Sequence, residues 1–214
     1  MQSHTDTMLS LLGQIRKQMN GALLDTFRYY GSDYGVNYGV TIHTLRDIAR
    51  SVGEDDDLAR FLYRQQVREL RLIAAWIASP GRVQTLEDLQ FWAVGIVNSE
   101  VAEQLAQALL SRIANVDMLL TEWCCGDNEL LAYAALLAAS RSTKCSVDRC
   151  CFAISTVATH FPDNRLAAQG VVALAASMLD GNESRKQILH CIEQLDDSAT
   201  VSYVRDEIAW RAEY

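Results

Sequence analysis

The sequence predicts an all-α protein, a right-handed α-solenoid of stacked helix pairs that curves to give a concave face. Three observations predict it. Residues that favour helix dominate the 214-residue chain, which contains only two prolines and eleven glycines. Short polar breaks separate successive apolar patterns of helical period. The pattern DNxLxA occurs at Asp127–Ala132 and again 36 residues later at Asp163–Ala168.

Residues 1–40 are expected to form N-terminal capping helices and a turn. Met8, Leu11 and Ile15 recur at helical spacing, and a second helical stretch around Phe27 continues or restarts that helix. Tyr-Gly then recurs every four residues, at Tyr30-Gly31, Tyr34-Gly35 and Tyr38-Gly39. Such glycine density favours a packed turn between helices. The alternative is a set of tyrosine faces presented to bases or to a peptide.

Residues 41–214 are predicted to be stacked helix pairs, so that 1–214 forms a single HEAT-like repeat domain. The apolar pattern changes phase at Gln65 and Gln66, which indicates two helices joined by a tight turn. Spacings of roughly 30 to 36 residues, each covering two helices, are typical of HEAT, armadillo or TPR arrays. The other predicted breaks are Gly53–Asp55, Ser79–Gly81, Gly126–Asn128, Phe161–Asp163 and Gly181–Asn182.

The charge balance opposes tight, unspecific binding of duplex DNA. The chain has 27 acidic and 19 basic residues, a net charge of -8, whereas a protein that binds phosphates usually presents about 6 to 10 basic contacts. Acids alternate with the bases on or just after the second helix of each pair, so paired surface charge is the expected arrangement. These bases are Arg68, Arg71, Arg112, Arg141, Lys144, Arg165, Arg205 and Arg211.

Four of these bases remain candidates for binding nucleic acid: Arg71, Arg112, Arg141 and Lys144. Arg141 and Lys144 are the most distinctive, because no acid lies between Arg141 and Asp148. They would either bind a phosphate or simply stabilise the C-terminus of the helix that they close.

Neither a metal nor a cofactor is expected. The adjacent pairs Cys124-Cys125 and Cys150-Cys151 lie in apolar helical patterns, where cysteine usually acts as a small buried hydrophobe. A metal site using Cys145, Cys150 and Cys151 is the competing interpretation, but it lacks CxxC spacing and a nearby spaced pair of histidines. The sequence also contains no glycine-rich phosphate loop or other cofactor motif.

No membrane association is expected, because no apolar run reaches the roughly 18 residues that a membrane span requires. The first residues, Met-Gln-Ser-His-Thr-Asp, lack the basic and apolar parts of a secretory signal. A cytoplasmic location is therefore predicted.

The segment Gly39–Ala49, GVTIHTLRDIA, together with Leu58–Tyr63 and Glu69–Ala75, resembles the N-terminal repeats of the AlkD-like DNA alkylation repair family. The likeness covers about the first two-thirds of the chain. It implies a curved array of HEAT-like helix pairs whose concave face holds DNA. Some members of that family excise alkylated purines as glycosylases, so the likeness also suggests this activity for the chain.

The resemblance suggests a catalytic position. The family pattern Trp-Asp-x-x-Asp, at the start of a helix on the concave face, is best matched by Ser99–Glu103. Glu103 then takes the place of the acid, and Ser99 takes the place of the tryptophan. A carboxylate there would stabilise a developing cation or orient water. The alternative is an ordinary solvated or helix-paired acid.

Three further positions depart from the family pattern. Tyr133 stands where the family has a basic residue, and Val171 or a neighbour stands where it has a second tryptophan. Trp210 resembles that tryptophan locally but lies about one repeat too far along the chain.

Two functions follow as hypotheses. The first is an AlkD-like protein that handles damaged or distorted duplex DNA, in which most of the glycosylase residues are replaced. The alternative is a non-enzymatic scaffold that binds a protein partner on its concave face. The sequence leaves open whether the protein is an enzyme.

Overall fold

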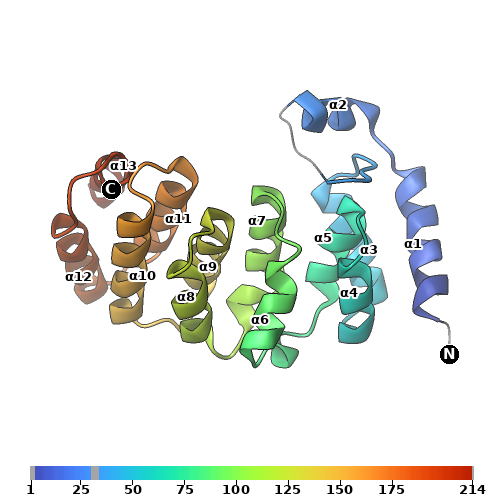
Figure 1. Cartoon of the computed structure of the whole chain (residues 1–214), viewed down its shortest axis with the longest axis horizontal. Coiled ribbons are helices and arrows are strands. Elements are labelled where there is room, and N and C mark those ends of the chain that lie inside the picture. Colours follow the sequence, from blue (N-terminus) through green and yellow to red (C-terminus); the bar gives the residue numbers. More distant parts are fainter. Residues whose placement is uncertain (1–2, 30–33, 214) are drawn as a thin grey trace.

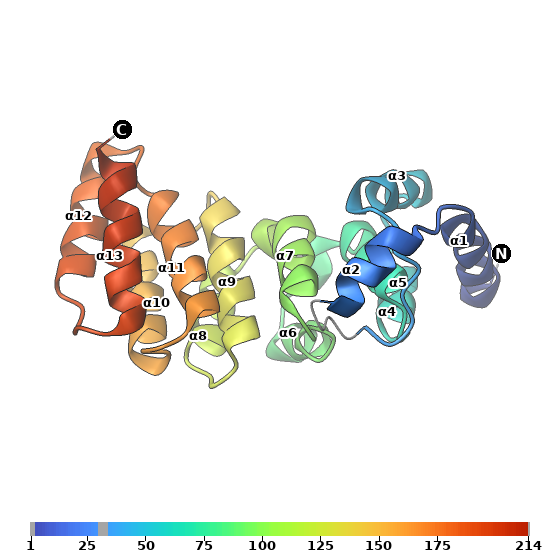
Figure 2. The ribbon, with the colours of Figure 1, turned by 90° about the horizontal axis from the view of Figure 1, so that it is seen from above.

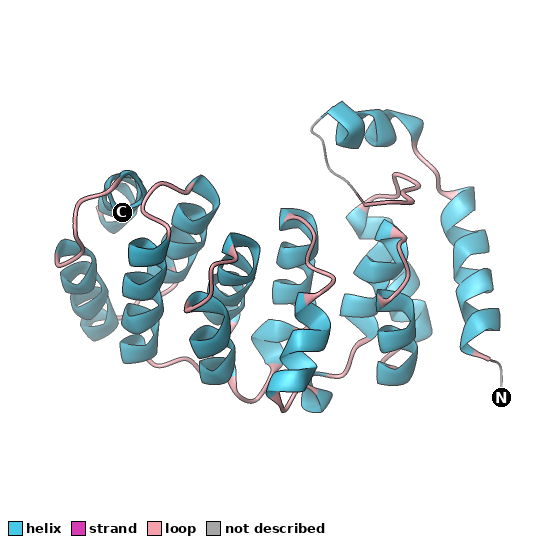
Figure 3. Cartoon of the chain, in the orientation of Figure 1, coloured by secondary structure: helices cyan, strands magenta, loops and turns pink. Residues whose placement is uncertain are grey.

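The computed structural model describes residues 3–29 and 34–213. They form thirteen α-helices and two 3-10 segments without any β-strand, so the predicted all-α class is confirmed (Figure 3). The helices are α1 His4–Lys17, α2 Gly21–Tyr29, α3 Ile42–Val52, α4 Asp56–Tyr63, α5 Arg68–Ile77, α6 Leu86–Ala93, α7 Ser99–Ala108, α8 Val116–Cys124, α9 Glu129–Arg141, α10 Val147–His160, α11 Arg165–Ala176, α12 Asn182–Glu193 and α13 Ala199–Ala212; the 3-10 segments are η1 Pro80–Arg82 and η2 Leu110–Arg112.

From α4 onwards the helices form pairs arranged in an arc (Figure 1). The second helices of the pairs, α5, α7, α9, α11 and α13, pack against one another in chain order, and α3 packs on α5 at one end. The first helices lie along the convex side of the arc, and the row of second helices follows its concave side. Figure 2 shows the same row from above. The array of helix pairs predicted from the repeats is therefore present.

Capping residues explain where most of the second helices begin. Asn98, Asn128 and Asn164 each accept a backbone N–H of the helix that follows, and Ser198 does the same for α13. Such a cap contributes about 1 kcal/mol to stability. The DNxLxA pattern is therefore a capping motif that recurs at the same place in successive pairs.

The helix α5 begins differently, because Val67 has no side chain that can cap it. Backbone groups of Val36, in the turn that precedes α3, bind this end of α5 instead. The Val36 N–H donates to the Gln66 carbonyl at 3.0 Å, and the Arg68 N–H donates to the Val36 carbonyl at 2.9 Å. The α4–α5 turn at Gln65 and Gln66 is the break that the change of apolar phase predicted.

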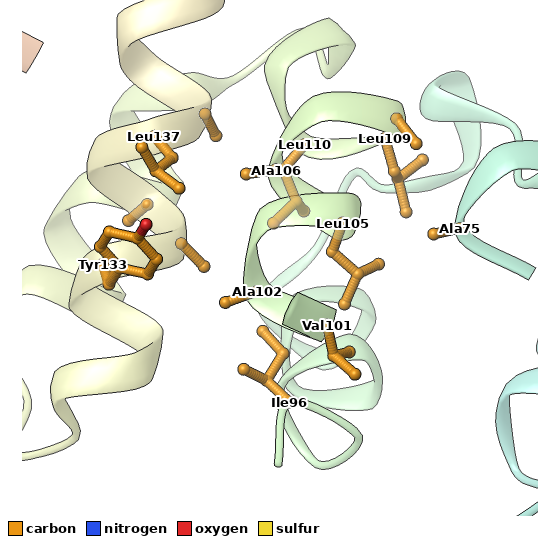
Figure 4. Packing of buried hydrophobic residues seen from close by; sticks show 14 of the residues in the cluster. Ala75, Ile96, Val101, Ala102, Leu105, Ala106, Leu109, Leu110, Tyr133 and Leu137 are labelled. Atoms are coloured by element: carbon orange, nitrogen blue, oxygen red, sulfur yellow. The ribbon is translucent and has the colours of Figure 1, made fainter. Parts of the chain in front are cut away.

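The second helices approach closely because they present small residues to each other. Figure 4 shows Ala102 and Ala106 on the side of α7 that faces α9, and both are fully buried. In α11, a Cβ added to Gly170 would lie 3.2 Å from the Tyr133 ring and 3.0 Å from Leu136. Small side chains allow two helix backbones to come together while larger residues nearby fill the core.

The N-terminal region covers one end of the array. Helix α1 packs against α4 and α5, and both ribbon views place α2 over the concave side of α5 (Figures 1 and 2). Two of the three Tyr-Gly steps form a packed turn, in which Tyr34 is 5% exposed and Gly35 and Gly39 adopt φ of 71° and 70°. The Tyr30-Gly31 step lies outside the described residues.

The cysteines follow the sequence prediction only in part. Cys124 and Cys150 are fully buried, but Cys125 is exposed because it ends α8. The thiols of Cys145 and Cys150 lie 3.3 Å apart, whereas Cys151 contacts Cys191 of α12 instead. The three cysteines of the competing metal interpretation therefore do not converge. Within residues 3–29 and 34–213, no group of three histidine, cysteine or acidic side chains is placed to hold a metal ion.

None of the helices in the described ranges is both long enough and apolar enough to cross a membrane.

Candidate nucleic-acid interface

A carboxylate and a phenol meet between α7 and α9. The Tyr133 hydroxyl donates to Oε1 of Glu103 at 3.1 Å. The Tyr133 side chain is 8% exposed, whereas Glu103 is exposed. Burial and the Glu103 carboxylate together raise the pKa of Tyr133 to about 12. The hydroxyl therefore stays protonated at neutral pH and remains a hydrogen-bond donor.

The packing around Tyr133 holds its ring in place. The ring lies beside the small residues of α7 (Figure 4) and against Gly170 of α11, where a Cβ would approach it to 3.2 Å. Because both neighbouring helices contact α9 closely, the ring has little room to change rotamer. Glu103 thus has a fixed donor on one side and solvent on the other.

The two positions at which the related family has tryptophan carry no aromatic side chain here. Ser99 is the exposed first residue of α7, and Val171 is fully buried in the core, where it presents no surface. Trp210 is 60% exposed on α13, with the Arg211 guanidinium 5.5 Å from the centre of its ring. Neither Ser99 nor Val171 therefore supplies an aromatic wall beside Glu103.

Three of the four candidate bases lie around the ends of α7 and α9. The Lys144 ammonium donates to the carbonyl oxygens of Arg112 and Ile113, at 3.3 Å and 3.0 Å. Nη1 of Arg141 donates to the Leu137 carbonyl at 2.9 Å. The Arg141 contact is of the kind expected for a base at the C-terminus of its own helix, whereas Lys144 contacts the segment after α7 and not the end of α9. Both side chains, like that of Arg112, are nevertheless exposed at the surface.

The fourth candidate, Arg71, lies apart from the other three. It belongs to the first turns of α5, and its Nε–H donates to the Gln65 carbonyl in the α4–α5 turn at 3.0 Å. The structure therefore divides the predicted basic residues between two places, one where the second helices begin and one where they end.

Arg68 was expected at the surface, but its side chain is only 1% exposed. Nε and Nη2 donate to the two carboxylate oxygens of Glu100, at 2.7 Å and 2.6 Å. Nη1 donates to Glu69 at 3.1 Å and to the Val40 carbonyl at 2.9 Å. Burial alone would lower the pKa of Arg68, but the carboxylates of Glu100 and Glu69 outweigh it and raise that pKa.

Aromatic residues and the turn complete this cluster. Phe27 of α2 lies over the Arg68 guanidinium at 4.5 Å, and the Tyr34 hydroxyl donates to Glu100. Glu69, which is fully buried, accepts the backbone N–H groups of Tyr38 and Val40 at 3.1 Å and 3.3 Å. The cluster therefore fixes α2 and the Tyr-Gly turn against α5 and α7.

A second polar group that the sequence analysis missed bridges α3 and α7. Nη2 of Arg46 donates to Gln107 at 2.8 Å and to Gln104 at 3.5 Å. Its guanidinium lies 4.5 Å from the centre of the Trp76 ring. Trp76 is partly buried, and this arginine covers one side of its ring. The spacing of these residues along the sequence gives no indication that they meet.

A sequence model described as DNA alkylation repair enzyme matches residues 13–170. The chain belongs to the DNA alkylation repair enzyme family. A search of curated protein sequences gave no match.

A HEAT-like repeat fold is found by structural comparison. A solved structure described as "a new family of proteins related to the HEAT-like repeat DNA glycosylases with affinity for branched DNA structures" superposes with a TM-score of 0.70. The match covers 94% of this chain and 93% of that chain at 12% sequence identity. It shows that this family member has a HEAT-like repeat fold over nearly its whole length.

Proposed function

We propose that this protein binds damaged or distorted duplex DNA on the concave side of its array, with Glu103 facing the bound strand. The observation that carries the proposal is the hydrogen bond between Tyr133 and Glu103. The family resemblance assigns these two positions to an acid and a base on separate repeats. Their meeting between α7 and α9 is what a shared site requires.

The side chains around Glu103 favour binding over fast base excision. A tyrosine in the place of a basic residue gives Glu103 a neutral donor, so the pair provides no cation for a phosphate. Ser99 and buried Val171 provide no aromatic surface on which a displaced base would stack. We therefore expect recognition of an altered duplex, with base release slow or absent.

A branched duplex is the most informative probe. The structural neighbour is described as having affinity for branched DNA, and a curved surface suits a bent or branched duplex better than a straight one. With a net charge of -8, unspecific attraction to phosphates should be weak. Shape should therefore contribute much of the selectivity.

Binding would be measured with undamaged, alkylated and four-way branched duplexes, at low and moderate salt. We expect the altered duplexes to bind at least about tenfold more tightly than straight, undamaged DNA, a difference of about 1.4 kcal/mol. Absence of binding to every duplex at low salt would end the proposal. It would favour the alternative, a scaffold that binds a protein partner.

The role of Glu103 has a separate test. Glu103→Gln removes a negative charge from the proposed DNA face, so we expect DNA affinity to rise by a few fold, while any base release is lost. The matched control is Glu122→Gln, an exposed acid on α8 of the convex side, which should change neither quantity. Base release that persists in Glu103→Gln would remove the proposed role of this carboxylate.

A further inference from the structure

A pocket of about 340 Å³ lies where the α4–α5 turn meets the end of α6. Its volume falls in the lower part of the range of small-molecule sites, about 300 to 1,000 Å³. No acidic residue lines it. The lining residues are Tyr63, Arg64, Gln66, Arg71, Phe91, Val94 and Gly95.

Two arginines line this pocket without a carboxylate partner. The Arg64 guanidinium lies 5.3 Å from the centre of the Phe91 ring, and Arg71 uses its Nε–H for the Gln65 carbonyl. In residues 3–29 and 34–213, neither side chain forms an ion pair with an acid. The terminal N–H groups of both arginines are thus left for an external acceptor.

The neighbouring Arg60 shows the contrast. It also lies over Phe91, at 4.9 Å, but it donates to Asp56 at 2.9 Å and to Asp88 at 2.8 Å. Its charge is therefore neutralised within the protein. The positive charge at the pocket comes from Arg64 and Arg71, held one on each side of the α4–α5 turn.

The floor of the pocket is rigid. The Tyr63 hydroxyl donates to the Trp92 carbonyl at 2.6 Å, and the rings of Tyr63 and Trp92 lie 4.6 Å apart. A Cβ at Gly95 would come within 2.4 Å of the Tyr63 ring. Glycine at this position lets the α6–α7 connection pass directly over the tyrosine, which fixes the depth of the pocket.

We propose that this pocket binds a phosphate group through Arg64 and Arg71. Guanidinium groups present paired N–H donors that match phosphate oxygens, and an aromatic ring beneath one of them limits its freedom before binding. Tyr63 and Phe91 exclude water from one side of the pocket, which strengthens the attraction. Inorganic phosphate and a phosphodiester of DNA share this chemistry.

A DNA strand is one of two sources, and this part of the proposal rests on the function proposed above. Gly95 lies in the short connection to α7, and Glu103 lies about one turn beyond Ser99, the first residue of that helix. A strand whose phosphate occupied the pocket would therefore pass beside the start of α7. A free phosphate compound is the other source and requires no DNA binding.

The test uses the full chain, the double variant Arg64→Gln/Arg71→Gln, and the control Arg149→Gln, an exposed arginine of α10 that lies 3.5 Å from Asp117. The first probe is inorganic phosphate, titrated against chloride at constant ionic strength. Thermal unfolding and the NMR signals of the arginine Nε–H groups report binding. The second probe is the branched duplex, whose affinity is measured as a function of salt.

We expect phosphate to stabilise the wild type and the control, and to shift the Arg64 and Arg71 signals, but not to stabilise the double variant. If a DNA strand is the source, the double variant should also bind the duplex about tenfold more weakly, with a salt slope smaller by about 1 to 2. Loss of the phosphate response with unchanged duplex binding supports a free phosphate compound as the source.

Two outcomes would overturn the inference. In the first, the wild type shows no phosphate response and the double variant binds the duplex as the wild type does. In the second, the phosphate response persists in the double variant. Failure of the wild type to bind any duplex would refute the proposed function alone, because the inorganic phosphate titration does not depend on DNA.

Discussion

Arg68→Met should lower the free energy of unfolding by about 3 to 5 kcal/mol, the cost typical of removing one partner of a buried ion pair. The substitution leaves Glu69, which is fully buried, without its cationic partner, and it removes the two guanidinium donors from Glu100, which keeps only the Tyr34 hydroxyl among the donors described above. Urea denaturation followed by circular dichroism measures the change. Hydrogen exchange should also show earlier opening of α2 and the Tyr-Gly turn, because the cluster fixes both.

Two further variants make the Arg68 result specific. Arg50→Met removes an exposed arginine of α3 that pairs with the exposed Asp47 at 2.8 Å, and its effect should stay within about 0.5 kcal/mol. Adding Glu69→Gln and Glu100→Gln to Arg68→Met should recover part of the loss, since no buried charge then lacks a partner. A loss below about 1 kcal/mol for Arg68→Met would show that the cluster does not hold the N-terminal region.

Trp92→Ala should cost about 3 to 5 kcal/mol, because it opens a large cavity in the core. Trp92 is fully buried, and its ring packs against Tyr63 at 4.6 Å and Phe91 at 5.1 Å. Loss of the indole would leave Tyr63 without its main neighbour at the junction of α4 and α6. Thermal and urea unfolding would measure the loss.

Trp210→Ala is the matched control for that change. Trp210 is 60% exposed on α13, so its removal should change stability by no more than about 0.5 kcal/mol. Equal losses for the two tryptophans would show that the packing of Trp92 against Tyr63 and Phe91 does not stabilise the fold more than an exposed tryptophan does.

The helices could be predicted because their signals are local. Asn128 and Asn164 each begin a helix through a hydrogen bond to a residue two or three positions away, so the repeated capping motif is visible in the sequence. The break at Gln65 and Gln66 was equally local, because the apolar phase changes within a single turn. These features required no knowledge of distant contacts.

The polar clusters could not be predicted because their partners are distant in the sequence. Arg68 meets Glu100, 32 residues away, and Arg46 meets Gln107, 61 residues away. In an isolated sequence both arginines resemble surface charges. Only the stacking of α3, α5 and α7 shows that the first is buried and that the second covers Trp76.

The Glu103 position is an intermediate case. Its pairing with Tyr133, 30 residues away, was not visible in the local pattern. The family resemblance nevertheless singles out both positions, and the helix stacking brings them together. The roles of Arg112, Arg141 and Lys144 in binding remain a prediction, since their observed contacts are with carbonyl groups of the protein.

Hydrogen–deuterium exchange of the full chain, with and without a branched duplex at low salt, tests the central claim most directly. We predict that the duplex slows exchange in α7, α9 and the residues after each of them, while the convex helices α8 and α10 stay unchanged. Protection confined to α8 and α10, or no protection at a duplex concentration that saturates binding, would contradict a DNA site on the concave side.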